Sequence, residues 1–218
     1  MSDAPGRSLF FWEVRMNGRI AGAGAWIATV SVILFAACML IPFDFGSYFV
    51  CMVLPIGYIM MCGGFYSESH EQRRAAAMVG MVFAAIYAAL IFLVYFAQLT
   101  TVRLDALEGQ AVRVLDFSRG GLLFNYDLLG YGMMALSTFF VGLTIEPRGR
   151  RVDKWLKRLM LAHGVFFFPC FLMPMTGVFG SMSGGEDSLG GVIALELWCA
   201  YFVPIGILAG AHFRKGGA

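Results

Sequence analysis

Six long apolar runs constrain the fold of this chain more than any other feature of its sequence. The runs are Ile20–Ile41, Gly46–Tyr66, Ala75–Thr101, Leu128–Ile145, Leu159–Phe179 and Gly190–Phe213. Each run reaches or approaches the ~20 residues that an α-helix needs to cross the hydrocarbon core of a bilayer. The runs are continuously apolar, whereas a membrane β-barrel would show alternating segments of ~10 residues. The sequence therefore predicts an all-α polytopic membrane protein with six transmembrane helices in one bundle.

The composition agrees with a bilayer as the solvent of most of the chain. Hydrophobic residues make up 59% of the 218 residues, and charged residues make up only 14%. A typical soluble domain is about 25% charged. The length suits one domain better than two. We therefore expect a single six-helix transmembrane domain over residues 1–218, located in a cell membrane, with the bacterial cytoplasmic membrane as the expected one.

The positions of the basic residues predict the orientation of the bundle. All but three of the 16 Lys and Arg residues lie in the N-terminal segment, the second-to-third connection, the fourth-to-fifth connection or the C-terminal segment. The exceptions, Arg103, Arg113 and Arg119, share the third-to-fourth connection. Cytoplasmic loops of membrane proteins carry an excess of Lys and Arg. Both termini are therefore predicted to be cytoplasmic.

Two segments outside the apolar runs are expected to contact the membrane surface. Residues 1–19 contain Leu9-Phe10-Phe11-Trp12 followed by arginines, a combination typical of the membrane–water boundary. This segment is predicted to form a short interfacial helix on the cytoplasmic side that leads into the first span. Residues 102–127 form the one long loop, on the outer side, where Leu104, Leu107, Ala111 and Leu115 recur at helical spacing and predict a partly helical segment.

Small residues mark two expected packing faces. The third run carries Ala76, Gly80, Ala84 and Ala88, and the sixth carries Gly206 and Gly210. Small residues at this spacing let neighbouring helices approach closely in a membrane. Two interpretations stay open: packing within the chain, or an interface with another subunit.

Prolines make the fifth run the least regular. Pro169 and Pro174 each remove a backbone hydrogen bond, and Gly164 and Gly177 weaken the helix further. Broken helices line binding sites in some transporters, although kinked helices also occur in bundles without that role.

Glu196 is the strongest candidate for a functional polar residue because it lies inside the sixth run. At 1.5 Å per residue it is roughly 9 Å below the outer boundary. A charge nearer the bilayer core costs ~2.5–3.5 kcal/mol, so the side chain is expected to face the bundle interior or to be protonated. The residues expected at a similar depth are Gln98, Tyr95, Tyr131 and Thr176, with Asp127 above them. Two interpretations stay open: an outward-facing site for an ion, proton or ligand, or a protonated acid bonded to a neighbouring helix.

No metal or cofactor site is expected. His70, His163 and His212 are all predicted towards the cytoplasmic side, but they are scattered and no paired Cys/His ligand set accompanies them. The sequence also has no phosphate-binding GxxxxGK[ST] loop, no CxxC and no GxSxG. No catalytic residue is therefore assigned.

Three classes of function follow from this architecture. The leading hypothesis is a transport-type protein of unknown substrate, either a permease-like membrane subunit or a small transporter. Its expected partners are the lipid bilayer and, as alternatives, a separate ATPase (with residues 67–74 as the contact), another membrane subunit or a second copy of the chain; nucleic acid is not expected. The second hypothesis is a non-catalytic assembly or accessory subunit that uses the small-residue faces. The third is a membrane-embedded enzyme that uses Glu196 or the inner-face histidines.

Overall fold

The computed structural model describes residues 5–147, 149–177 and 188–214, and these residues are helical with no β-strand. The long helices are α1 (Pro5–Leu40), α2 (Asp44–Glu68), α3 (Arg74–Ala97), α5 (Leu122–Thr144) and α9 (Ser188–Arg214). A sixth long element combines α6 (Arg151–His163) with α7 (Phe167–Leu172). Side chains are described from residue 15 in α1 and from residue 192 in α9.

Among the described residues, six helices are long and apolar enough to cross a membrane, in agreement with the six predicted apolar runs. The helices of three spans begin well before the predicted runs: α1 at Pro5 rather than Ile20, α6 at Arg151 rather than Leu159, and α5 at Leu122 rather than Leu128. Asp127 had marked the predicted end of the outer loop. In the structure it lies inside α5 with its side chain buried, so its charge did not end the helix.

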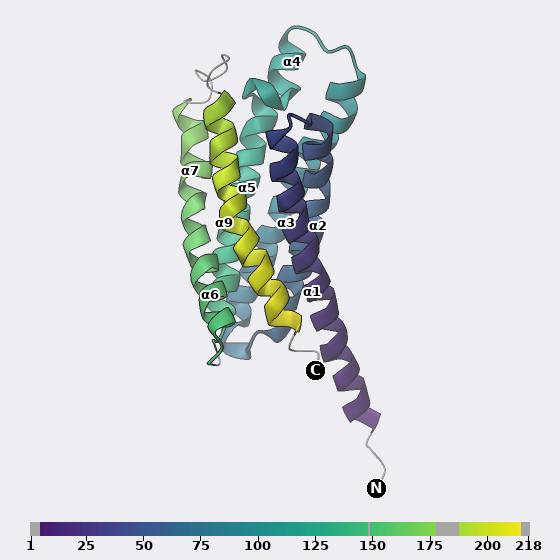
Figure 1. Cartoon of the computed structure of the whole chain (residues 1–218), viewed down its shortest axis with the longest axis vertical. Coiled ribbons are helices and arrows are strands. Elements are labelled where there is room, and N and C mark those ends of the chain that lie inside the picture. Colours follow the sequence, from purple (N-terminus) through teal and green to yellow (C-terminus); the bar gives the residue numbers. More distant parts are fainter. Residues whose placement is uncertain (1–4, 148, 178–187, 215–218) are drawn as a thin grey trace.

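The six spans form a ring in which neighbours in sequence are neighbours in space (Figure 1). α1 packs against α2, α2 against α3, α3 against α5, and α5 against α6 and α7. The ring closes where α9 packs against both α6 and α1. α1 begins and α9 ends at one end of the bundle, here called the terminal end, and the short helix α4 (Gln110–Leu115) lies at the other, the α4 end.

The small-residue faces pack within the chain. A Cβ atom on Gly80 would lie 2.8 Å from the Val141 side chain of α5, and one on Gly206 would collide with Thr29 of α1. A close helix approach that was not anticipated joins α1 and α2: Gly24 and Gly57 lie against each other, and a Cβ on Gly57 would lie 2.6 Å from the backbone nitrogen of Ala28. Gly80 and Gly206 therefore pack against other helices of the same chain, which is the first of the two interpretations of the small-residue faces.

The fifth span is irregular, as its prolines and glycines predict. α6 ends at His163 and is followed by a 3-10 turn (Gly164–Phe166), by α7 and by a second 3-10 turn (Met173–Thr176). Gly177 ends this segment with a φ of 70°, a left-handed conformation that suits glycine.

Both segments expected at the membrane surface contain helix. The N-terminal segment is helical from Pro5 and leads without a break into the first span, since α1 is continuous from Pro5 to Leu40 and extends beyond the other helices at the terminal end (Figure 1). Its location at the membrane surface stays a prediction. The loop between the third and fourth spans is partly helical, as predicted, although α4 covers only Gln110–Leu115 and leaves Leu104 and Leu107 outside it.

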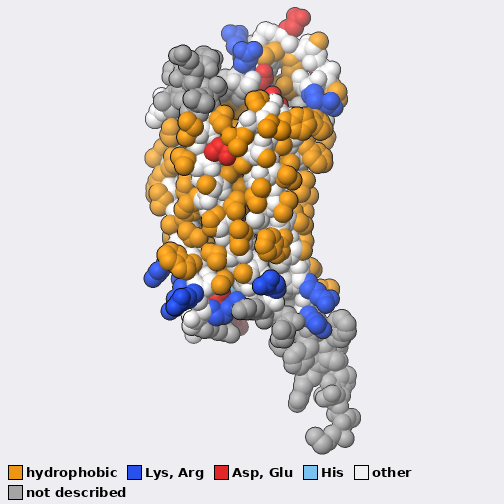
Figure 2. Space-filling view, viewed as in Figure 1, with side chains coloured by type: hydrophobic (Ala, Val, Ile, Leu, Met, Phe, Trp, Pro, Cys, Tyr) orange, Lys and Arg blue, Asp and Glu red, His pale blue; other side chains and the backbone are white. Residues whose placement is uncertain are grey.

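The outer surface of the bundle is apolar over the length of the helices. Figure 2 shows a broad band of hydrophobic side chains, with Lys and Arg gathered at the terminal end and charged side chains at the α4 end. Large apolar side chains such as Leu93 and Leu197 are about two-thirds exposed on this surface. These properties are compatible with an integral membrane protein.

Candidate functional site

Asp127 is the most unusual polar residue among those that the structure describes. It lies on the second turn of α5, and its side chain is only 3% exposed. Its Oδ1 atom is buried without a hydrogen-bond partner among the described residues. Buried polar groups in proteins are nearly always hydrogen-bonded, so an unpaired carboxyl oxygen requires an explanation.

Hydroxyl and thiol groups from three helices surround Asp127. We call this set the Asp127 cluster: Asp127 and Tyr131 of α5, Cys51 of α2, and Tyr87 and Tyr95 of α3. The Tyr131 hydroxyl lies 4.0 Å from the Cys51 sulfur, and Tyr95 interacts with the Asp127 carboxyl group. Asp127 lies within electrostatic range of each of the other four side chains.

The Asp127 cluster contains a second unpaired polar atom. The Tyr87 hydroxyl is buried and has no hydrogen-bond partner among the described residues. Its ring packs against that of Tyr131 at 5.8 Å, and Tyr131 in turn meets Trp198 of α9 at 4.8 Å. The cluster therefore offers both an acidic group and a free hydroxyl inside a packed aromatic core.

Gln98 lies near the same end of the bundle but is fully engaged in holding the backbone. Its side-chain nitrogen donates to the Leu115 carbonyl oxygen at 2.7 Å, and its oxygen accepts from the Phe117 backbone N–H at 3.1 Å. Gln98 is buried on the π-helical turn Gln98–Val102 that ends the third span. It therefore ties the segment after α4 to that span, and its amide group is occupied by backbone partners rather than directed at a ligand.

Glu196 and Thr176 do not join the cluster. Glu196 lies on α9 and is partly exposed, with its Oε1 atom buried and unpaired among the described residues. Thr176 is exposed, and its hydroxyl donates to the Met173 carbonyl oxygen at 2.7 Å. Of the site residues expected from the sequence, the structure thus brings together Asp127, Tyr131 and Tyr95.

His163 is completely buried and fully hydrogen-bonded. The Trp198 indole N–H donates to its Nε2 atom at 3.1 Å, so the ring proton belongs on Nδ1. Nδ1 lies 2.7 Å from the Thr138 oxygen, and the Thr138 hydroxyl donates to the Ala135 carbonyl oxygen at 2.8 Å. This chain of bonds joins α5, α6 and α9 around a neutral imidazole and leaves it no vacant nitrogen.

The other two histidines belong to ion pairs at the terminal end. His212 of α9 lies 2.8 Å from both Asp153 of α6 and Glu68 of α2. His70 faces Glu146 at 3.5 Å. The three histidines therefore do not meet, and the described residues contain no group of His, Cys, Asp and Glu arranged to hold a metal ion.

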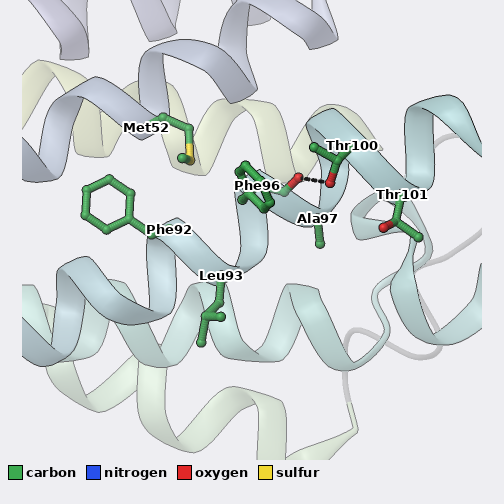
Figure 3. Close-up of a pocket in the computed structure, with 7 residues that line it drawn as sticks. All are labelled: Met52, Phe92, Leu93, Phe96, Ala97, Thr100 and Thr101. Carbon is green, nitrogen blue, oxygen red and sulfur yellow. Dashed lines mark hydrogen bonds between the residues drawn. The ribbon is translucent and has the colours of Figure 1, made fainter.

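A groove of about 460 Å³ lies on the outside of the bundle, separate from the Asp127 cluster. Its lining includes Met52 of α2 together with Phe92, Phe96 and Thr100 (Figure 3). The Thr100 hydroxyl donates to the Phe96 carbonyl oxygen at 2.6 Å, so its donor is already used. The groove is mostly apolar and open to the side, which suits contact with lipid chains rather than binding of a polar substrate.

Sequence reasoning did not identify Cys51 and Tyr87 as site residues. Tyr87 and Tyr95 flank Ile91 at intervals of four residues, and all three side chains are buried. Tyrosines in membrane proteins are enriched at the interfaces, so two tyrosines on a single buried helix face would have been a usable signal. Cys51 gave no such signal, because cysteine commonly behaves as a small buried apolar residue.

No family model, curated protein or solved structure matches this chain. Its function therefore has to be inferred from the geometry of its own residues.

Proposed function

We propose that the chain is a small proton-coupled transport protein of the membrane, in which Asp127 takes up and releases the proton. The observation that carries this proposal is the buried Asp127 carboxyl oxygen, which lies inside a membrane-spanning helix without a hydrogen-bond partner among the described residues. Acidic residues in such positions are costly and commonly mark ion or proton pathways.

A proton fits the Asp127 cluster better than a metal ion does. Cys51 and Tyr87 are fully buried, and Asp127 and Tyr95 are nearly so, which leaves little space for a hydrated cation. Metal sites in proteins also need several oxygen or nitrogen ligands, and the described residues contain no such group. Tyrosine hydroxyl groups both donate and accept hydrogen bonds, so they suit the transfer of a proton to or from the carboxyl group.

The two other classes of function have less support. The glycines that would serve an accessory subunit as a docking face, Gly80 and Gly206, pack against α5 and α1. The histidines of an enzyme hypothesis are engaged in contacts between helices, because both nitrogens of His163 and of His212 face partners. The remaining candidate of that hypothesis, Glu196, keeps an unpaired oxygen among the described residues as Asp127 does, but it lies outside the Asp127 cluster.

The test uses the full chain reconstituted in liposomes that are adsorbed to a solid-supported membrane. A rapid pH step across these liposomes should produce a transient current as protons bind electrogenically. We expect Asp127→Asn to abolish this current, because the amide cannot take up a proton. The control Asp105→Asn, in the exposed connection between the third span and α4, should keep it.

Two results would overturn the proposal: a wild-type current no larger than that of protein-free liposomes, or a current unchanged in Asp127→Asn. Equal thermal unfolding of the two variants in detergent would establish that the comparison is between folded proteins.

A further inference from the structure

The first turns of α6 carry one exposed face of cations and a tryptophan. Arg151, Lys154, Trp155 and Arg158 recur at intervals of three and four residues, and all four are exposed. Residues at this spacing lie on the same side of an α-helix. The opposite side, with Asp153, Leu156 and Met160, is buried against the bundle.

The cations of α6 and the loop before it divide into two groups. Arg150 lies 3.5 Å from Asp153 and donates to the Ala211 carbonyl oxygen, and Lys157 donates to the Ile145 carbonyl oxygen at 3.0 Å. In contrast, Arg151, Lys154 and Arg158 form no ion pair with any residue in the described ranges. Their charge is therefore available to an external partner.

Trp155 places this face at the boundary of the membrane. Its side chain is 56% exposed, and the Arg158 guanidinium lies over its ring at 5.5 Å from the centroid. Tryptophan is enriched at headgroup depth, where the ring is partly in hydrocarbon and partly in water. Figure 2 shows Lys and Arg side chains at the terminal end, next to the edge of the apolar band.

We propose that the face formed by Arg151, Lys154, Trp155 and Arg158 binds the headgroups of anionic phospholipids in the leaflet at the terminal end. The three cations supply charge complementary to the lipid phosphate, and arginine matches a phosphate with paired N–H donors. Trp155 holds the face at the depth where those phosphates lie. The site is independent of the proton-binding role proposed for Asp127, which lies on another helix near the α4 end.

The test measures how brominated lipids quench the fluorescence of Trp155 in the reconstituted full chain. The Trp155 contribution is the difference between the wild type and Trp155→Phe. We expect brominated phosphatidylglycerol to associate several-fold more strongly than brominated phosphatidylcholine. Each of Arg151→Gln, Lys154→Gln and Arg158→Gln should lower that preference by up to about fivefold, since one cation near an anionic surface contributes on this scale.

The matched control removes three exposed cations from other helices at the same end. The triple variant R15Q/R19Q/R214Q changes the net charge as much as R151Q/K154Q/R158Q does, and it should keep the preference for phosphatidylglycerol. Equal loss in both triple variants would mean that only the overall charge attracts the lipid, and it would overturn the proposed site. Equal quenching of the wild type by the two lipids would overturn it as well. If a triple variant fails to insert into the membrane, the single variants test the proposed site instead, because each of them keeps two of the three cations.

Discussion

Two buried polar side chains of this protein differ in whether their hydrogen-bonding capacity is satisfied. His163 uses both ring nitrogens, with Trp198 on one side and Thr138 on the other. Asp127 is almost as deeply buried but keeps a carboxyl oxygen without a partner among the described residues. Leaving a buried acceptor unpaired costs about 1–3 kcal/mol. We therefore infer that His163 has a structural role and that Asp127 is the functional candidate.

Replacing His163 with alanine should destabilise the bundle by about 2–4 kcal/mol. The substitution leaves the Trp198 N–H without its acceptor and opens a cavity between α5, α6 and α9, and both effects add to the cost. Thermal or denaturant unfolding of the purified protein in detergent measures the change. The control is His70→Ala at the terminal end, where the side chain is 57% exposed and the loss should stay below about 1 kcal/mol. Similar losses in the two variants would contradict a structural role specific to His163.

At the scale of elements, glycines decide how closely the helices approach. Lipid provides no hydrophobic drive for association between helices, so close packing has to provide it. The contact of Gly24 with Gly57 brings α1 onto α2, and Gly80 brings α3 onto α5. Not every glycine in a span has this role, because a Cβ on Gly63 of α2 would meet nothing within 4 Å.

Gly57→Ala and Gly63→Ala form a matched pair within α2. A methyl group at position 57 would lie 2.6 Å from the backbone nitrogen of Ala28, so the helices have to separate. We expect Gly57→Ala to lower the free energy of unfolding by about 1–3 kcal/mol. Gly63→Ala should be neutral or stabilising by up to about 1 kcal/mol, because alanine favours a helix. Unfolding curves of the two variants measure the change in the free energy of unfolding. Equal losses in Gly57→Ala and Gly63→Ala would contradict the prediction that the close contact between α1 and α2 excludes a methyl group at position 57.

At the scale of the whole molecule, an even number of crossings places both ends of the chain on one side. The six spans agree with this arrangement, and α1 begins at the end of the bundle where α9 finishes (Figure 1). The distribution of Lys and Arg predicts that this side is the cytoplasm.

Reporter fusions test this orientation directly. A reporter that is active only in the cytoplasm should work when fused at the C-terminus or at Gly149, between α5 and α6. A reporter that is active only outside should work at Gly109, next to α4. The physical reason is that the cytoplasmic excess of positive charge resists translocation. Outside activity at Gly149 would reverse the orientation, and activity of both kinds of reporter at the C-terminus would contradict a fixed topology.

The sequence predicted the helical fold in more detail than it predicted which polar side chains lie together. The six runs and the irregular fifth span were readable because hydropathy and proline act locally along the chain. The sequence did not predict that α5 begins at Leu122, because a charged residue such as Asp127 suggests a loop unless its burial is known. The sequence favoured Glu196 over Asp127 as a site residue because Glu196 lies within an apolar run, and that position was the only evidence of burial that the sequence offered.

By itself, the sequence determined the helical class, the number of spans and the segments that join them. The reason is that hydrocarbon offers no hydrogen bonds, so a long apolar segment has to satisfy its backbone internally as a helix. Only the tertiary structure decided which polar side chains are paired. That outcome depends on the rotation and depth of each helix against its neighbours, which left His163 with two partners and an Asp127 oxygen with none among the described residues.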